Sequence, residues 1–168
     1  EIRSYTPQLK GNVVRVIGHK LDPGTDILSI VYEQEAPVSF EKEVFQELGS
    51  ISDTVSPRDL VGRVDLRDQV IVTIDGDDAK DLDDAISLWR TPTGNYQLGV
   101  HIADVSYYVA EGSAIDQEAL TRGTSIYLVD RVIPMLPHKL SNGICSLQPH
   151  TDRLTISCFM EITPNGEV

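Results

Sequence analysis

Apolar runs separated by turn residues divide the chain into short elements. Four of these runs have the composition and length of strands: residues 70–74, 85–89, 96–104 and 153–162. A turn at residues 91–95 joins the second run to the third, so we expect a sheet that is largely antiparallel. The pair Asn165-Gly166 follows the last run and is a strong hairpin signal that calls for a returning strand. We therefore expect the sequence to end inside its domain.

Two amphipathic helices are predicted, over residues 37–48 and 113–123. The second helix opens with a capping-box pattern from Ser113 to Asp116 and ends at Gly123. Helices and strands together predict an α+β fold, in which helices pack on a mixed, largely antiparallel sheet. The apolar stripes expected to be buried are Val44, Phe45 and Leu48 in the first helix, and Ile115, Ala119 and Leu120 in the second.

The first part of the chain is predicted to hold two further strands, at residues 12–17 and 26–32. A turn-rich loop separates them, and two strands are too few to close a barrel. Between them and the main sheet lies a helix followed by a charged, turn-rich linker. The pattern divides the chain into residues 1–35, residues 36–69 and a larger domain over residues 70–168.

Composition limits the classes of protein to which the chain can belong. With 40% hydrophobic residues among 168, it can bury a core. Its net charge of −12 opposes nucleic-acid binding, which normally uses a basic surface. The sequence has no long apolar run and no leader pattern, and Cys145 and Cys158 lack zinc-ligand spacing. These features predict a cytoplasmic protein with reduced thiols and no membrane partner.

Six aspartates lie between residues 75 and 84, at the turn between the first two predicted strands. Two carboxylates about 4 Å apart repel by about 4 kcal/mol at an effective dielectric constant near 20, so a tight cluster needs a cation, a proton or solvent. A solvated loop is the simplest interpretation of an acidic run. Here Ala79, Leu82 and Ala85 alternate with the acids, which favours an anchored loop. An EF-hand is disfavoured because Ala79 and Lys80 occupy positions that need a ligand and a glycine.

The run from Thr73 to Ala85 resembles the active-site signature of the RNase II/RNase R family of 3′-to-5′ exoribonucleases, and more closely the ribonuclease R branch. The resemblance implies a centre that holds Mg²⁺ or Mn²⁺, with Asp83 as the catalytic acid most important to the chemistry. Asp77 and Asp78 lie where members vary, so no role is carried over to them. The implied metal ligands are Asp75, Asp81, Asp83 and Asp84.

A second block, residues 122–147, resembles the wall of the channel that receives the RNA 3′ end in this family. The stacking tyrosine of the family matches Tyr127, and Arg122 and Lys139 are candidate phosphate contacts. The strands expected before residue 35 resemble the end of an OB-like cold-shock domain. The chain as a whole resembles that end together with the first half of the RNB catalytic domain.

The resemblance implies a processive enzyme that hydrolyses single-stranded RNA from its 3′ end to nucleoside 5′-monophosphates by two-metal catalysis, and structured RNA in the intact protein. The 3′ end of single-stranded RNA is the expected partner, with the ribosome or other RNA-decay factors as further ones. We expect this stretch alone to be inactive. Two alternatives are an RNA-binding scaffold without activity and a phosphatase or nuclease of another metal-dependent class. The phosphatase motif DxDx(T/V) does not appear at Asp75.

Overall fold

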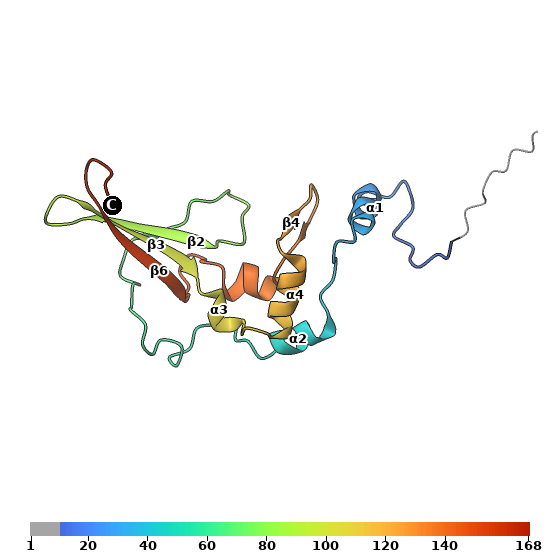
Figure 1. Cartoon of the computed structure of the whole chain (residues 1–168), viewed down its shortest axis with the longest axis horizontal. Coiled ribbons are helices and arrows are strands. Elements are labelled where there is room, and N and C mark those ends of the chain that lie inside the picture. Colours follow the sequence, from blue (N-terminus) through green and yellow to red (C-terminus); the bar gives the residue numbers. More distant parts are fainter. Residues whose placement is uncertain (1–10) are drawn as a thin grey trace, which may run out of the picture.

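The computed structural model describes residues 11–168, and an antiparallel sheet forms its largest element (Figure 1). Its strand order is β1-β2-β3-β6, and every neighbouring pair is antiparallel, which confirms the predicted sheet. The tight turn at residues 91–95 joins β2 to β3 as expected. The strands are β1 (Ile71–Val72), β2 (Asp84–Arg90), β3 (Tyr96–Ala103) and β6 (Thr155–Ile162).

Short helices gather at the end of the sheet where β3 finishes and β6 begins (Figure 1). A small separate hairpin, β4 with β5, rises beside α4. None of the helices within the described residues is long and apolar enough to cross a membrane. The remaining elements are α1 (Thr25–Glu33), α2 (Lys42–Leu48), α3 (Val105–Tyr108), α4 (Ala114–Arg122), β4 (Ile126–Tyr127), β5 (Val132–Ile133) and the π-helical turn η1 (Leu140–Ile144).

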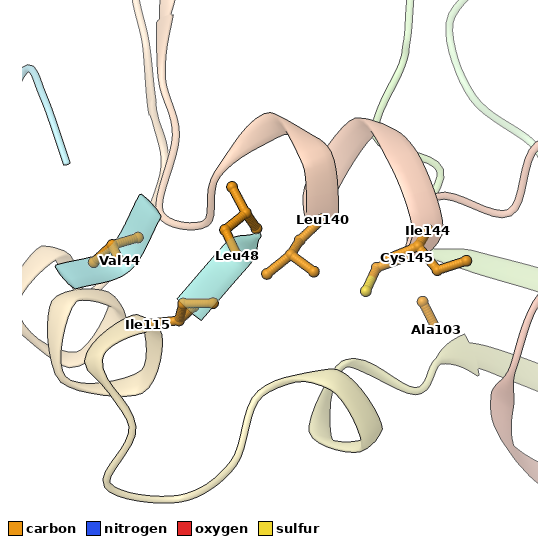
Figure 2. Packing of buried hydrophobic residues seen from close by; sticks show 7 residues of the cluster. All are labelled: Val44, Leu48, Ala103, Ile115, Leu140, Ile144 and Cys145. Carbon is orange, nitrogen blue, oxygen red and sulfur yellow. The ribbon is translucent and has the colours of Figure 1, made fainter. Parts of the chain in front are cut away.

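The hydrophobic core lies between α2, α4, η1 and the last residue of β3 (Figure 2). Only one side of α2 and one side of α4 are covered, so each of these helices contributes only a narrow stripe of side chains to the core. Phe45 is therefore 57% exposed and Leu120 is 70% exposed, and the prediction that these two are buried is wrong. The residues of the core cluster are Val44, Leu48, Ala103, Ile115, Leu140, Ile144 and Cys145.

The predicted strands before residue 35 are absent from the structure. Residues 12–17 have no regular structure, and residues 26–32 lie in α1. A short apolar run such as this one does not distinguish a strand from a helix by periodicity alone. Gly24 starts the helix in a left-handed conformation with φ 81°, and α1 forms its backbone hydrogen bonds without a partner strand. Similarly, the run at residues 70–74 forms only a two-residue, exposed edge strand.

Residues 56–67 form an arm that two ion pairs hold next to the sheet: Arg63 pairs with Asp104 directly after β3, and Arg67 pairs with Asp152 shortly before β6. Arg63 donates to Asp104 at 2.7 Å, although 41 residues separate them along the chain. Asp104 is buried and also caps α3 by accepting from the Tyr107 amide. Tyr107 in turn donates through its hydroxyl to Asp59 at 2.6 Å. Asp104 thus has a structural role directly after β3.

A buried histidine links three strands on one face of the sheet. The two ring nitrogens of His101 in β3 lie 2.9 Å from Ser87 Oγ in β2 and 2.8 Å from Ser157 Oγ in β6. Burial lowers the pKa of His101 below its ordinary value of 6.5, because it disfavours the charged imidazolium. The neutral ring suits both hydroxyls, since each can donate or accept.

This lowered pKa makes stability depend on pH. Unfolded His101 binds a proton near pH 6.5, whereas the folded form resists it, so unfolding becomes easier as the pH falls from 6.5 through the folded-state pKa. We expect the free energy of unfolding to decrease between about pH 7.5 and about pH 5.5. Denaturant titrations of wild type and His101→Gln test this. The slope should flatten in His101→Gln and persist in His138→Gln, which changes an exposed histidine; equal slopes in all three would contradict it.

Burial of the α4 stripe also gives a direct test. Ile115→Ala should lower the free energy of unfolding by about 2–5 kcal/mol, because it opens a cavity in a fully packed site. Leu120→Ala on the same helix should change it by about 0.5 kcal/mol or less, since that side chain lies in solvent. Chemical denaturation of the two variants measures the difference. Equal losses would mean that Leu120 is also packed.

Candidate active site

The acidic loop, residues 73–83, connects β1 to β2 and combines buried apolar anchors with outward-facing acids. Leu82 and Ala85 are buried and Ala79 is half-buried, so the alternation seen in the sequence does anchor the loop. Asp83 and Asp84 are exposed, and Asp81 is half-buried. These buried side chains therefore anchor the backbone of the loop between its acidic residues.

The four aspartates predicted as metal ligands interact electrostatically around Asp83. The pKa of Asp83 is raised first by partial burial, then by repulsion from Asp81, Asp84 and Asp75 in that order. Asp83 is thus the member of the set that feels the other three. Chain neighbours account for two of these interactions, whereas Asp75 comes from the opposite end of the loop.

The donor set suits a hard divalent cation, although it is not a preformed cage. Within residues 11–168, no group of three or more His, Cys, Asp or Glu side chains is arranged to hold a metal ion. Mg²⁺ does not require such a cage, because it is usually held by one or two carboxylates together with waters and substrate phosphates. Carboxylates that repel one another also gain from a shared cation. The residues fit Mg²⁺ or Mn²⁺ by the chemistry of their oxygens.

A serine and a glutamine that follow η1 hold the backbone of the acidic loop. Ser146 Oγ donates to the Lys80 carbonyl at 2.7 Å and accepts from the Leu82 amide at 3.0 Å. Gln148 donates through Nε2 to the same Lys80 carbonyl at 3.0 Å. Sequence reasoning assigned no role to Ser146 or Gln148, although Ser146 belongs to the second family-like block. The signal available in the sequence was a serine within the apolar run from Ile144 to Leu147.

Tyr127 is brought next to the acidic loop by the β4–β5 hairpin. Its hydroxyl donates to Asp81 Oδ2 at 2.7 Å, and this bond is the main cause of its raised pKa. The ring is 67% exposed and borders a hollow of about 230 Å³ shared with Ile27 and Ile30 of α1. The structure therefore joins two residues that the sequence placed 46 positions apart, one from each family-like block.

Arg122 is held inside the structure, and its predicted contact with RNA phosphate needs correction. Its side chain is 2% exposed, and it pairs with Glu118 at 2.8 Å. Its guanidinium lies 3.7 Å from the centre of the Phe40 ring. It also donates to the carbonyls of residues 37, 39 and 134. With its donors engaged in this way, Arg122 fixes the end of α4 to the segment that precedes α2.

Lys139 likewise serves the structure. Its ammonium donates to the Leu48 carbonyl at the end of α2 and lies 3.4 Å from Asp53. A cation at the carboxyl end of a helix satisfies a free carbonyl and complements the helix dipole. Lys139 thus caps α2, and its contact with RNA phosphate stays a prediction.

Comparison with known proteins identifies the class. The family model of the RNB domain matches residues 63–168, and that of the cold-shock domain matches residues 1–41. The chain belongs to the RNB-domain family. A curated relative, "Ribonuclease R" of Thermotoga maritima, is 58% identical over 161 residues, covering 95% of this chain and 23% of the relative. The chain thus spans about a quarter of that relative's length.

Solved structures share this fold. The Mycoplasma genitalium RNase R in complex with double-stranded RNA superposes with a TM-score of 0.82 at 37% identity, covering 89% of this chain and 26% of that one. Yeast Ssd1, described as a pseudonuclease, superposes with a TM-score of 0.69 at 22% identity, covering 88% of this chain and 19% of that one. The second likeness concerns the fold alone.

The corrected role of Arg122 can be tested by stability. Arg122→Ala should lower the free energy of unfolding by about 3–5 kcal/mol, because it leaves the half-buried Glu118 carboxylate and several carbonyls unpaired. Arg131→Ala is the matched control, since its pair with adjacent Asp130 is exposed and its loss should change stability little. Urea denaturation measures both. A stable Arg122→Ala variant with weakened RNA binding would restore the phosphate-contact prediction.

Proposed function

We propose that the protein carrying this sequence is a metal-dependent 3′-to-5′ exoribonuclease that releases nucleoside 5′-monophosphates from RNA. The observation that carries the proposal is the contact of Tyr127 with Asp81, which joins the acidic loop with its four family-like aspartates to the second family-like block, in a chain of the RNB-domain family. Its substrate is the 3′ end of single-stranded RNA, and structured RNA when the rest of the protein takes part. The relative named above as bound to double-stranded RNA supports RNA as the ligand.

The four carboxylates have two different roles in this proposal. Asp75, Asp81 and Asp84 supply the oxygens that hold Mg²⁺ or Mn²⁺. When bound, such ions lower the pKa of a coordinated water and offset negative charge on the departing 3′ oxygen. Asp83 orients the attacking water or the leaving group. Until cations are bound, the negative charge of the four aspartates would repel the phosphates of RNA.

Tyr127 provides a surface for the terminal bases of the RNA. Its ring is largely exposed while its hydroxyl is held by Asp81, so the ring orientation is fixed relative to the carboxylates. Stacking on an aromatic ring is worth about 1–3 kcal/mol per base and tolerates any sequence. This property suits an enzyme that must digest RNA regardless of its bases.

The acidity of the chain requires phosphate contacts from elsewhere. Arg122 is engaged in structural bonds within the chain. Metal-bound charge and parts of the protein outside these residues therefore provide most of the attraction.

A scaffold that keeps the fold without activity is the second candidate function. The yeast pseudonuclease has the same fold, so the fold itself does not decide activity. The presence of all four aspartates at the spacing of the family signature favours the enzyme. The 168-residue stretch alone is expected to lack activity, because catalytic and RNA-binding groups of the family lie outside the matching residues.

A charge-matched pair of variants tests the proposal. Asp83→Asn in the full-length protein should reduce turnover of a single-stranded RNA by about a hundredfold or more while RNA binding persists. Asp77→Asn removes the same charge from the same exposed loop and should leave turnover near that of wild type. EDTA should abolish mononucleotide release from wild type, and added Mg²⁺ should restore it. Binding of RNA without metal-dependent release of mononucleotides would favour the scaffold.

A further inference from the structure

A single buried hydroxyl holds the backbone on both sides of Asp81. Ser146 is completely buried, and its Oγ bonds the carbonyl that precedes Asp81 and the amide that follows it. The distances of 2.7 and 3.0 Å are those of well-formed hydrogen bonds. One side chain therefore fixes the peptide units on either side of a carboxylate that also accepts from Tyr127.

Neighbouring bonds make this attachment rigid. The Leu147 amide donates to the Leu82 carbonyl at 2.8 Å, and Gln148 Nε2 reaches both the Lys80 carbonyl and Ser146 Oγ. On the other side of Ser146, its own carbonyl accepts from Arg153 Nε at 2.8 Å. The acidic loop is thus attached to a segment that is itself held at both ends, by the core below and by Arg153 beside β6.

The same attachment reaches Asp83. The Ala103 amide at the end of β3 donates to the Asp83 carbonyl at 3.0 Å, so the loop has external backbone partners at residues 80, 82 and 83. Buried hydroxyls are costly unless they are bonded, and Ser146 lies next to the core residue Cys145. Its hydrogen bonds to the acidic loop account for a hydroxyl at this buried position.

We propose that Ser146 is a positioning residue, which holds the backbone on both sides of Asp81 and thereby sets the position of this carboxylate next to Tyr127. Ser146 contacts neither substrate nor metal. It acts through the loop, with Gln148 as its auxiliary. The inference rests on the proposed function, since the group that the loop serves is the metal-binding one.

Amide hydrogen exchange tests the attachment without any reference to activity. In Ser146→Ala, the peptide covering residues 80–84 should exchange faster than in wild type, because the Leu82 amide loses its acceptor. Ser141→Ala is the matched control: it removes a hydroxyl from the same segment that bonds only its neighbour Asn142 among the described contacts. Unchanged exchange at residues 80–84 in a folded Ser146→Ala variant would overturn the inference.

Metal titration of the full-length protein tests the consequence. Ser146→Ala should raise the Mg²⁺ concentration for half-maximal RNA hydrolysis about tenfold, as is typical when a group that orients metal ligands is lost. The KM for RNA should stay near that of wild type. Direct Mn²⁺ binding, followed by electron paramagnetic resonance, should weaken to a similar extent. Ser141→Ala should match wild type in all three measurements.

Two further variants keep the test decisive. Ser146→Thr retains the hydroxyl and should restore most of the Mg²⁺ response, whereas Gln148→Ala should shift it in the same direction as Ser146→Ala but less. If Ser146→Ala does not fold, Gln148→Ala carries the test, and its wild-type exchange and Mg²⁺ response would overturn the inference. Wild type without metal-dependent activity would refute the proposed function instead, while the exchange result would still decide the role of Ser146.

Discussion

Mutual repulsion among the carboxylates of the acidic loop is the constraint on which the rest of this structure depends. Asp83 feels the charge of three other aspartates, which raises its pKa in addition to the effect of burial. A loop with such a charge density would open toward solvent if its backbone were free. It is kept in place by buried anchors and by backbone bonds from Ser146, Leu147 and Ala103. Two opposing effects therefore set the position of the loop: repulsion among its carboxylates and the contacts that hold its backbone.

The segment that holds the acidic loop lies next to the hydrophobic core. The core lies between α2, α4, η1 and the end of β3, as Figure 2 shows, and the segment that holds the acidic loop leaves directly from η1. Cys145 and Ser146 are adjacent, one facing the core and the other bonded to the loop. Burial raises the pKa of the Cys145 thiol to about 11, so this residue acts as an apolar part of the core rather than as a reactive group.

Two basic residues near the site form structural contacts within the chain. Arg122 and Lys139 join α4 and η1 to the segments before and after α2. In the function proposed above, the attraction of RNA phosphates would come from cations held by the acids or from other parts of the protein. Metal binding and RNA binding would then be coupled, because bound cations would supply the positive charge that RNA phosphates require.

The sequence by itself determined the antiparallel strands, the Ser113 cap of α4 and the family-like aspartate spacing, because these depend on local pattern. It did not distinguish helix from strand at residues 26–32, where a short apolar run is compatible with both. Only the tertiary structure decided that Leu120 is exposed, that Arg122 is internal and that Tyr127 meets Asp81. These outcomes depend on contacts between residues far apart in the chain, and no local pattern specifies which distant partner a side chain will find.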